Sequence, residues 1–448
     1  MKLHRIVAAS VLLGSLSTAA LAHDEHQYEA AQARNIIYVI GDGMGFEYIS
    51  AYRYAFDDPS KPGLSATAFD DLLKGSATTY PDDDTWVTDS AAGATALATG
   101  VKSYNGAIGV DANKHPQQTL MELAREQGWS TAAVSTSQVT HATPASFFTH
   151  HPSRKMYDAI ADSLATPIAD GQWSFDVLLG GGYDNFNRDD KNWLPELKRQ
   201  GMTVVTEFDQ LDDVQQTPVL GVFAPYGLPH AIDDDAARLS YMTKHALRLL
   251  TERRKPFALM IEGSQIDWCG HANDIACAVN EMHSLNLTLK VIKQYLKAHP
   301  DTLLVVTADH STGGLTLGRD GIYQWHAERV RNINASIAEM SRTLVDMPAA
   351  EWREYLKVNL ALKLSDEQWQ QLLQPAQQED KKARQQAIRQ ALVAVTAKVT
   401  GTGWTTSGHT AVDVPVLAAG PGAEHFSGYM DNTDIAKALF KVIGGQNP

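Results

Sequence analysis

The stretch NIIYVIGDGMG, residues 35–45, decides how the chain is expected to fold. It holds a short apolar run with β-branched residues, and this run ends among glycines around Asp42. The pattern predicts a buried strand followed by a tight turn. Similar runs recur at residues 130–135, 175–179, 219–223, 257–261, 303–307 and 414–418.

Helical patterns separate many of these predicted strands, for example at residues 117–127, 236–252 and 278–297. Apolar strands that alternate with helices are typical of a mostly parallel sheet covered on both faces. The sequence therefore predicts an α/β fold, a three-layer α/β/α sandwich around a mostly parallel central sheet. In such sheets, ligands bind outside the carboxyl ends of the strands.

The first residues have the pattern of an export signal. A basic start precedes an apolar run, residues 6–16, which is too short to span a bilayer, and small residues at 20–22 fit a cleavage site. Residues 1–22 are therefore predicted to be a signal peptide, and residues 23–448 the mature catalytic domain. No later apolar run is long enough for a membrane span, so we expect a soluble protein that is periplasmic or secreted.

The chain is acidic, with a formal net charge of −14, and loss of Lys2 and Arg5 with the signal peptide makes it more negative still. A protein of this charge is a poor candidate for a nucleic-acid-binding partner. Any anionic substrate must be attracted by local positive charge, such as metal ions or a well-placed arginine.

The chain has two cysteines, Cys269 and Cys277. On one continuous helix they would be too far apart to bond, whereas in a loop they could pair, and an oxidising compartment permits a disulfide. Cys269 also lies two residues from His271 and could instead bind a metal. The sequence leaves these alternatives open.

Residues 326–399 differ in composition from the rest of the chain. They are rich in Gln, Lys, Arg, Glu and Ala, and residues 366–398 in particular have a helical pattern. We interpret the segment as a helical insertion within the catalytic domain. It is either a lid or dimer contact, or a solvated helical decoration without its own role.

Acidic or imidazole side chains follow several of the predicted strands. The carboxyl ends of parallel strands lie at one edge of a sheet, so these side chains are expected to converge there. A carboxylate cluster at that edge repels itself unless cations neutralise it. The residues concerned are Asp42, Glu262, Asp309 and His310, together with Ser135, which leads into a segment containing His141 and Thr143.

A second cluster contains Asp267 and His271, which are four residues apart. On a helical turn they face the same way and can bind one metal ion. Imidazole with carboxylate suits zinc, whereas an all-oxygen set suits magnesium. His409 is a candidate third ligand from a distant part of the chain. Each residue alone is more typical of an ordinary polar group, but together they indicate metal binding.

The stretch TDSAAGATA, residues 88–96, places Ser90 beside Asp89 just before a run of small residues. A serine here lies at or near a helix N-terminus, where free N–H groups and the helix dipole favour an anion. The position suits a nucleophile that attacks a phosphate or sulfate, and it also suits an ordinary helix cap. The Asp and His clusters elsewhere favour the nucleophile.

Together these motifs resemble those of the alkaline phosphatase family. They occur in the family's order over most of the mature chain. The motifs are GDGMG at 41–45, TDSAAG at 88–93, HATP at 141–144, SRK at 153–155, residues 262–271, TADH at 307–310, and His409. The resemblance implies an exported alkaline phosphatase, a metal-dependent phosphomonoesterase whose substrates are small phosphate monoesters.

The resemblance also implies two Zn²⁺ ions and one Mg²⁺ ion per chain. The matching ligand sets are Asp267, His271 and His409 for one zinc; Asp42, Asp309 and His310 for the second zinc, with Ser90 beside it; and Asp42, Thr143 and Glu262 for magnesium.

By the same resemblance, Ser90 is the nucleophile that forms a phosphoserine intermediate, Arg154 holds the phosphate, and Asp89 orients Arg154. Bound zinc lowers the pKa of a serine hydroxyl, and two zinc ions roughly 4 Å apart can clamp the attacking and leaving oxygens. A guanidinium offers two phosphate oxygens a bidentate contact. A surface salt bridge is the alternative role for Arg154.

Two positions depart from the best-known bacterial pattern. His141 stands where that enzyme type has Asp, and Trp268 stands where it has Lys. The combination resembles the marine bacterial type. Loss of the lysine charge predicts weaker phosphate retention and altered magnesium dependence. Packing at the rim of the site is the alternative for Trp268.

Other functions and assemblies stay open on the sequence alone. A phosphodiesterase or sulfatase of the same architecture is the nearest rival, but the sulfatase motif is not seen, and phosphodiesterases usually have Thr in place of Ser90. Thr143 with Glu262 favours the three-metal form. A non-catalytic exported protein that binds metal or phosphate is a weaker alternative. The family is commonly dimeric, so both a homodimer and a monomer remain open.

Overall fold

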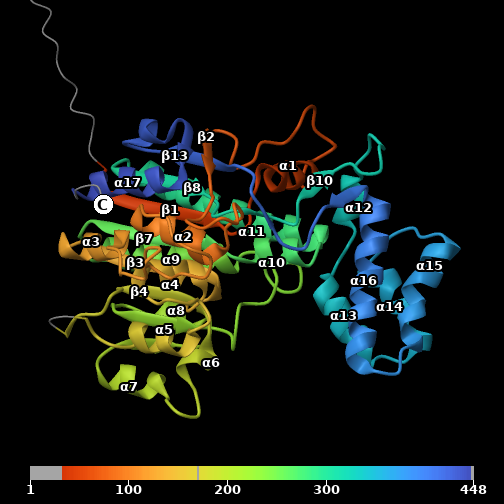
Figure 1. The fold of residues 1–448 in the computed structure, drawn as a ribbon, viewed down its shortest axis with the longest axis horizontal. Helices are drawn as coiled ribbons and strands as arrows, with labels where there is room; N and C mark the ends of the chain where they lie inside the picture. Colours follow the sequence, from red (N-terminus) through yellow and green to blue (C-terminus); the bar gives the residue numbers. More distant parts are fainter. Residues whose placement is uncertain (1–32, 169–170, 445–448) are drawn as a thin grey trace, which may run out of the picture.

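The computed structural model describes residues 33–168 and 171–444, so the predicted signal peptide, residues 1–22, lies outside the described residues. Within the described ranges, ten strands form one sheet (Figure 1). Their order is β14 (Gly428–Asp431), β2 (Leu73–Thr78), β13 (Val414–Ala419), β8 (Thr302–Thr307), β1 (Asn35–Gly41), β7 (Phe257–Gly263), β3 (Ser130–Gln138), β4 (Val177–Gly181), β6 (Val219–Val222) and β5 (Thr203–Val205).

The sheet is mostly parallel, as predicted. The neighbouring strands run parallel except where β13 pairs with β2 and β8. All the apolar runs predicted as strands form strands of this sheet. The sequence did not predict β2, β5 and β14, which lie at or next to the two edges of the sheet.

Helices cover both faces of the sheet, which confirms the predicted α/β/α sandwich (Figure 1). One layer contains α2 (Ser90–Thr99), α3 (Leu120–Glu126), α4 (Ala142–Phe148) and α17 (Asn432–Ile443). The other contains α1 (Phe46–Ala55), α9 (Arg238–Glu252) and α11 (Ile275–Ala298). Shorter helices lie beyond β3, namely α5 (Tyr157–Leu164), α6 (Tyr183–Phe186), α7 (Trp193–Arg199) and α8 (Gln210–Asp213).

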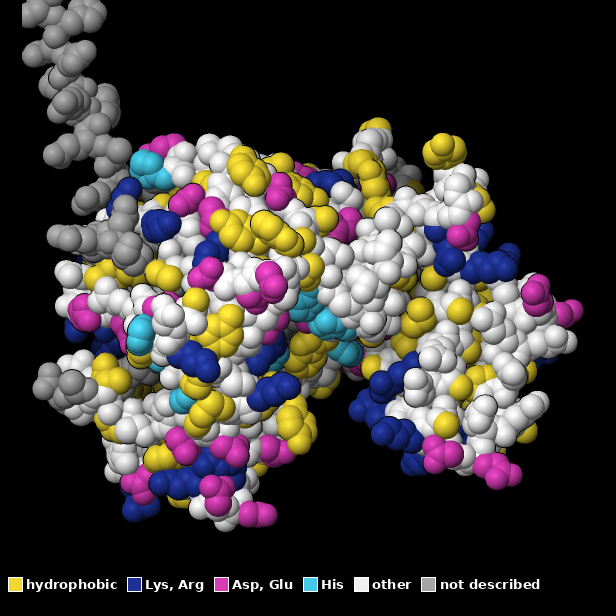
Figure 2. All heavy atoms as spheres, in the orientation of Figure 1, with side chains coloured by type: hydrophobic (Ala, Val, Ile, Leu, Met, Phe, Trp, Pro, Cys, Tyr) yellow, Lys and Arg dark blue, Asp and Glu magenta, His cyan; other side chains and the backbone are white. Residues whose placement is uncertain are grey.

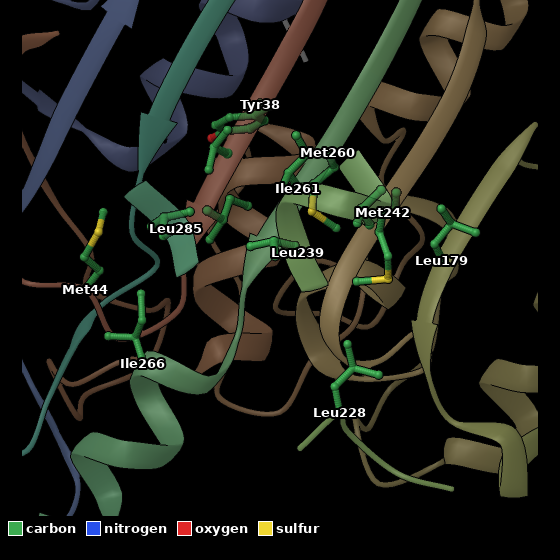
Figure 3. Close-up of a cluster of buried hydrophobic side chains, with 14 of the residues drawn as sticks. Tyr38, Met44, Leu179, Leu228, Leu239, Met242, Met260, Ile261, Ile266 and Leu285 are labelled. Atoms are coloured by element: carbon green, nitrogen blue, oxygen red, sulfur yellow. The ribbon is translucent and has the colours of Figure 1, made fainter. Parts of the chain in front are cut away.

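Part of the hydrophobic core lies between β7 and the helices α9 and α11 (Figure 3). Ile261 of β7 gathers with Leu239 and Met242 of α9 and with Leu285 of α11, and all four are essentially inaccessible to solvent. Burial of a side chain of this size contributes about 1.5–3 kcal/mol. The core therefore fixes β7, whose carboxyl end carries Glu262, firmly in the sheet.

A helical segment stands apart from the sheet at the right of Figure 1. It contains α12 (Ala327–Arg331), α13 (Ile337–Asp346), α14 (Trp352–Asn359), α15 (Asp366–Leu373) and α16 (Lys381–Thr400). Its two ends are joined by the antiparallel pair β10 (Leu315–Leu317) and β11 (Thr402–Trp404). The helical pattern predicted over 366–398 is broken, because a 3₁₀ turn and a loop separate α15 from α16.

Cys269 and Cys277 form a disulfide, which resolves the alternative left open by the sequence. Cys269 belongs to α10 (Gln265–His271) and Cys277 to α11. Asn273, between the helices, has a left-handed φ of +52°, and this turn brings the cysteine Cα atoms to 5.5 Å. Among the described residues, no helix is both long and apolar enough to cross a membrane.

Candidate active site

The predicted metal-binding side chains meet at the carboxyl ends of the central strands. β8, β1, β7 and β3 are neighbours in the sheet, and their register aligns Ile40 with both Glu262 and Thr307. Asp42 and Asp309 follow directly after two of these strands. Consequently three carboxylates from distant parts of the sequence, all fully buried, converge at one edge.

Ser90 is the first residue of α2, and Asp89 is its N-cap. The capping role that the sequence allowed for Ser90 belongs to Asp89, whose Oδ1 accepts hydrogen bonds from the N–H groups of Ala92 and Gly106, both at 3.0 Å. The Ser90 hydroxyl is thereby free to point at the carboxylate cluster. Its Oγ lies 3.2 Å from Nε2 of His310.

Several oxygen atoms in this cluster are buried and have no hydrogen-bond partner among the described residues. They are Oδ1 and Oδ2 of Asp42, Oδ2 of Asp309, Oε1 of Glu262 and Oγ1 of Thr143. Unpartnered buried oxygens are costly, particularly when they belong to carboxylates. A cation is the group that satisfies such a set, and Asp42, Asp309 and His310 have ligand atoms within 4.8 Å of one another.

Asp267 and His271 lie on α10 and face the same way, as their spacing predicts; Oδ2 of Asp267 is 3.3 Å from Nε2 of His271. His409 reaches them through a short antiparallel pair, β9 (Ser311–Thr312) and β12 (His409–Thr410). Its Nε2 lies 3.1 Å from Nε2 of His271 and 3.5 Å from Oδ1 of Asp267. The structure therefore brings this second predicted set together as well.

The three histidines of the cluster are held in one orientation. Nδ1 of His409 donates to the carbonyl of Thr88 at 2.8 Å, and Nδ1 of His271 donates to the carbonyl of Ser407. Nδ1 of His310 faces the hydroxyl of Thr312. These partners place the proton on Nδ1 and leave the Nε2 lone pair for a metal.

The electrostatics of the cluster also call for cations. Burial, and then the nearby carboxylates of Asp309, Asp267 and Glu262, raise the pKa of Asp42 well above its ordinary value. Burial, and then Asp267, raise the pKa of Asp309 in the same way. Burial lowers the pKa of His310 well below its usual range, so its imidazole stays neutral. Divalent cations would neutralise this set and allow every carboxylate to ionise.

Arg154 lies beside the cluster and connects Asp89 to His141. Its Nη1 donates to Oδ2 of Asp89 at 3.0 Å, and its Nη2 donates to Nε2 of His141 at 3.1 Å. Burial and the neighbouring guanidinium lower the pKa of His141 to about 3, so its imidazole is neutral and accepts this hydrogen bond. Arg154 is therefore held by contacts on both ends of its guanidinium.

Trp268 packs against His141, with ring centroids 5.9 Å apart in an edge-to-face arrangement. It also covers Gly227, where an added Cβ would collide with the indole ring.

Figure 2 shows exposed histidine side chains on one face of the molecule, beside the hollow that separates the helical segment from the rest.

The sequence interpretation missed several residues that support the cluster. Ser137 contacts Oε2 of Glu262 at 3.2 Å, beside the predicted Ser135, which contacts the same oxygen at 2.8 Å. Thr312 donates to Asp267, and the amide of Asn105 bridges the N–H of Asp89 and the carbonyl of Val87. The strand predicted over residues 130–135 pointed to Ser135 but stopped short of Ser137, which also belongs to β3. Thr312 lies in the two-residue strand β9 and Asn105 in a turn, and neither has a recognisable sequence pattern.

The alkaline phosphatase family model matches residues 33–444. The chain belongs to the alkaline phosphatase family. It is 41% identical to alkaline phosphatase 3 of Bacillus subtilis over 98% of this chain and 95% of that protein. The structure resembles a cold-active alkaline phosphatase from a psychrophilic Shewanella, at a TM-score of 0.85 and 44% identity, over 91% of this chain and 99% of the other.

A more distant alkaline phosphatase structure is also informative. It is a histidine-to-glutamate variant of the enzyme from the Antarctic bacterium TAB5, described with magnesium bound in its M3 site. The two chains are 27% identical, the TM-score is 0.69, and the match covers 93% of this chain and 99% of the other. Family membership and these relatives establish that the chain is an alkaline phosphatase and a hydrolase.

Proposed function

We propose that the chain is an exported phosphomonoesterase that hydrolyses phosphate monoesters through a phosphoserine intermediate on Ser90. The observation that carries the proposal is the position of the Ser90 hydroxyl. It lies at the start of α2, 3.2 Å from Nε2 of His310, beside carboxylate oxygens that have no hydrogen-bond partner in the part of the chain that the structure describes. A serine that served only as a helix cap would need none of these neighbours.

The residues present fit the three ions that the family resemblance implies. Asp267, His271 and His409 would hold one zinc ion, and Asp42, Asp309 and His310 the other. Asp42, Thr143 and Glu262 would hold magnesium, and their unpartnered oxygens support this assignment. When bound, the ions act as Lewis acids that favour the ionised form of the serine hydroxyl and neutralise charge on the phosphoryl group.

The chain's own residues then bind and orient the substrate. Ser90 lies at the N-terminus of α2, where the helix dipole favours the negative charge of the phosphoryl oxygens. Arg154 offers two N–H groups to the phosphate, and Asp89 fixes its position at 3.0 Å. Ser90 attacks phosphorus in line with the departing alcohol, and a water then hydrolyses the phosphoserine to release inorganic phosphate.

His141 and Trp268 tune this site in our proposal. The acidic and imidazole groups of Asp42, His141 and Glu262 lie within 4.8 Å of one another, so His141 borders the magnesium position. The TAB5 variant that exchanges a histidine for glutamate was described with magnesium in its M3 site, which supports a histidine near this metal as a modulator of magnesium binding. Trp268 supplies no positive charge, and we therefore expect weak retention of the phosphate product.

The remaining sequence predictions belong to the same proposal. Residues 1–22 would direct export to the periplasm or the medium, and residues 23–448 would form the catalytic domain. Residues 326–399 would be an insertion that borders the active-site face as a lid or as a contact in a homodimer. Small phosphate monoesters are the proposed partners, and no nucleic acid is expected.

The test is hydrolysis of p-nitrophenyl phosphate by the mature protein with zinc and magnesium supplied. Ser90→Ala should remove nearly all activity, and acid-quenched wild type should carry phosphate on Ser90. The matched control is Ser103→Ala, which changes a buried serine outside the cluster and should retain activity. Metal analysis should give two zinc ions and one magnesium ion per chain. Equal rates for Ser90→Ala and wild type would refute the mechanism.

A further inference from the structure

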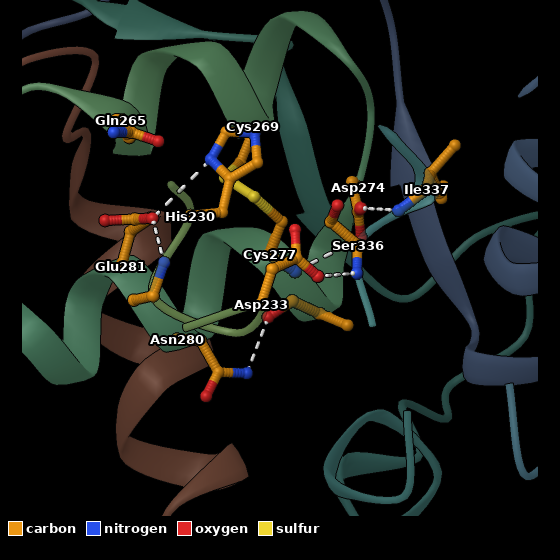
Figure 4. The surroundings of a disulfide bond; sticks show 12 residues. His230, Asp233, Gln265, Cys269, Asp274, Cys277, Asn280, Glu281, Ser336 and Ile337 are labelled. Atoms are coloured by element: carbon orange, nitrogen blue, oxygen red, sulfur yellow. Dashed lines mark hydrogen bonds and ion pairs between the residues drawn. A yellow bond between two sulfur atoms is a disulfide. The ribbon is translucent and has the colours of Figure 1, made fainter. Parts of the chain in front are cut away.

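A second group of side chains that could bind a metal surrounds the disulfide between α10 and α11 (Figure 4). His230, Cys269, Cys277 and Glu281 each offer one ligand atom, and these atoms lie within 4.8 Å of one another. The two cysteines are joined as a disulfide. This group has no role in the phosphatase site, whose ligands come from the opposite side of α10 and from the strand ends.

The group is enclosed by protein. Cys269, Cys277 and Glu281 are buried, and His230 is only partly exposed, which leaves a path to solvent on one side. Oε1 of Glu281 accepts a hydrogen bond from the N–H of Ala231 at 2.8 Å and lies 3.6 Å from Nδ1 of His230. Among the described residues this Nδ1 makes no hydrogen bond, and it faces the Glu281 carboxylate as an ion pair, so two of the four candidate ligands already point at each other.

The donor set matches zinc. Two thiolates, an imidazole and a carboxylate complete a tetrahedral site, in which Zn–S is about 2.3 Å and Zn–N or Zn–O about 2.0–2.1 Å. These bond lengths put neighbouring ligand atoms about 3.3–3.8 Å apart. From the observed limit of 4.8 Å, the nitrogen and oxygen ligands need to close by about 1.5 Å at most, whereas the two bonded sulfurs have to move apart.

The cysteines can reach this geometry once their bond is broken. Their Cα atoms lie 5.5 Å apart on two separate helices, so rotation about the Cα–Cβ bonds can separate the sulfurs while α10 and α11 stay in place. In the disulfide neither sulfur is a thiolate, and only thiolates bind zinc. The same four residues thus have two exclusive states, one closed by the disulfide and one open to a metal.

We propose that the chain contains a redox-gated zinc site, in which reduced Cys269 and Cys277 bind zinc together with His230 and Glu281, and disulfide formation releases it. On release, the two thiolates give two electrons to a small-molecule disulfide oxidant, and the bond between Cys269 and Cys277 forms. The oxidant takes up two protons and becomes two thiols, and Zn²⁺ leaves. The newly made chain has the zinc-bound state before its cysteines are oxidised, and it has the disulfide afterwards.

Both states hold the same helices together. α10 is seven residues long, which is too short to be stable by itself, and it carries Asp267 and His271 of the active site. Cys269 lies between these two ligands, and its link to Cys277 ties α10 to the long helix α11. A zinc ion would supply the same link in the reduced chain, so the helix that carries the catalytic ligands stays anchored in either redox state.

The experiment compares the intact mature protein in its oxidised form and after reduction by a phosphine under argon. Elemental analysis at buffered zinc should find one more zinc per chain in the reduced form. With cobalt(II) in place of zinc, the reduced form should show a thiolate-to-cobalt charge-transfer band. The oxidised form should not show it, because the active-site ligands are nitrogen and oxygen. Reoxidation with a small disulfide should release one equivalent of metal to a chromogenic chelator.

Substitutions of the proposed ligands test whether these residues bind the additional zinc ion. Cys269→Ser with Cys277→Ser should abolish the charge-transfer band, and His230→Ala should weaken metal binding in the reduced form at least tenfold. The matched control is His245→Ala, a buried histidine on α9 outside the group, which should leave the affinity unchanged. Reduced wild type without an additional metal or a thiolate band would overturn the proposal, whether or not the variants fold. Binding by His230→Ala as tight as by wild type would overturn the ligand set.

Discussion

The role of Asp89 can be separated into its two parts by one substitution. Oδ1 of Asp89 accepts two backbone N–H groups, from Ala92 and Gly106, whereas Oδ2 accepts Nη1 of Arg154. In Asp89→Asn the two backbone donors select the amide oxygen for the Oδ1 position. The amide NH₂ then faces the guanidinium of Arg154. Because both groups are hydrogen-bond donors, the contact with Arg154 is lost. The variant should keep the helix cap and release the arginine.

The expected magnitude follows from the contact. A hydrogen bond between charged groups contributes about 1.5–3 kcal/mol. The side chains of Arg154 and Asp89 are 21% and 23% exposed, so solvent screening reduces the value. With this reduction, the contact between Asp89 and Arg154 contributes about 1–2 kcal/mol. A tenfold change corresponds to 1.4 kcal/mol, so KM for a small phosphate monoester should rise about 5–30-fold. Asp89→Ala should in addition lose the cap, at a cost of about 0.5–2 kcal/mol in the free energy of unfolding.

The assay is a double-mutant cycle with Arg154→Ala, with KM, kcat and inhibition by phosphate measured for each variant. In the wild-type background Asp89→Asn should raise KM and weaken phosphate inhibition, while the free energy of unfolding measured in urea falls by no more than about 1–2 kcal/mol, the contribution of the lost contact. In the Arg154→Ala background the same substitution should have little further effect on KM, because the residue acts through the guanidinium. Equal effects of Asp89→Asn in both backgrounds would refute the reasoning, and so would a KM within twofold of wild type.

Chelation with EDTA should abolish phosphatase activity and lower Tm, because the buried carboxylates lose their cations. Addition of zinc and magnesium should restore both the activity and Tm. Full activity of the metal-free protein would contradict the proposed metal site. Trp268→Lys adds a positive charge beside the phosphate and should strengthen product inhibition, so an unchanged inhibition constant would exclude a tuning role. His150 and Glu122 form a 2.8 Å contact that raises the pKa of His150, against the effect of burial, and lowers that of Glu122. The contribution of this ion pair to the free energy of unfolding should be complete at pH values between 4.5 and 6.5, the ordinary pKa values of glutamate and histidine. It should be lost as the pH rises through the raised pKa of His150. His150→Asn should therefore reduce Tm more at pH 6 than at pH 9, and an equal loss at both would refute the pairing.

The sequence predicted the centre of the fold better than its edges, for a physical reason. Central strands such as β1 and β8 are buried on both faces, so they appear as continuous apolar runs. β2 and β14 are largely exposed and have the sequences LKGSAT and GYMD, which carry no such pattern. The antiparallel direction of β13 also leaves no trace in its own sequence, because it depends on how the chain returns from the helical segment.

The disulfide shows a similar limit. The spacing of Cys269 and Cys277 was compatible with a continuous helix, on which they cannot bond. The deciding feature is Asn273, whose left-handed conformation ends α10, and Asp274, which caps α11 through the N–H of Cys277 at 3.1 Å. Asparagine tolerates this conformation, but the sequence alone does not show that the chain adopts it.

The candidate site was predictable where it depends on strand ends and helical spacing, as for Asp42, Asp309 and the pair of Asp267 with His271. The position of His409 could not be derived from such rules. It depends on the pairing of β9 with β12, strands of two residues each, which aligns His409 with Thr312. The sequence offered His409 only as a candidate third ligand from a distant part of the chain, and the family resemblance assigned it to the site of Asp267 and His271.

The small residues after Ser90 have a further meaning in the structure. α2 is buried along its whole length, and a Cβ at Gly93 would lie 3.0 Å from the carbonyl oxygen of Asp309 and 3.1 Å from its Cβ. The helix therefore packs directly on the loop that carries Asp309 and His310. This close approach brings the Ser90 hydroxyl to 3.2 Å from His310, and a larger residue at position 93 would push the helix and the hydroxyl away. The run of small residues, the Asp89 cap and the buried Ser90 hydroxyl are thus parts of one arrangement, which presents a serine and a helix N-terminus to the same anion.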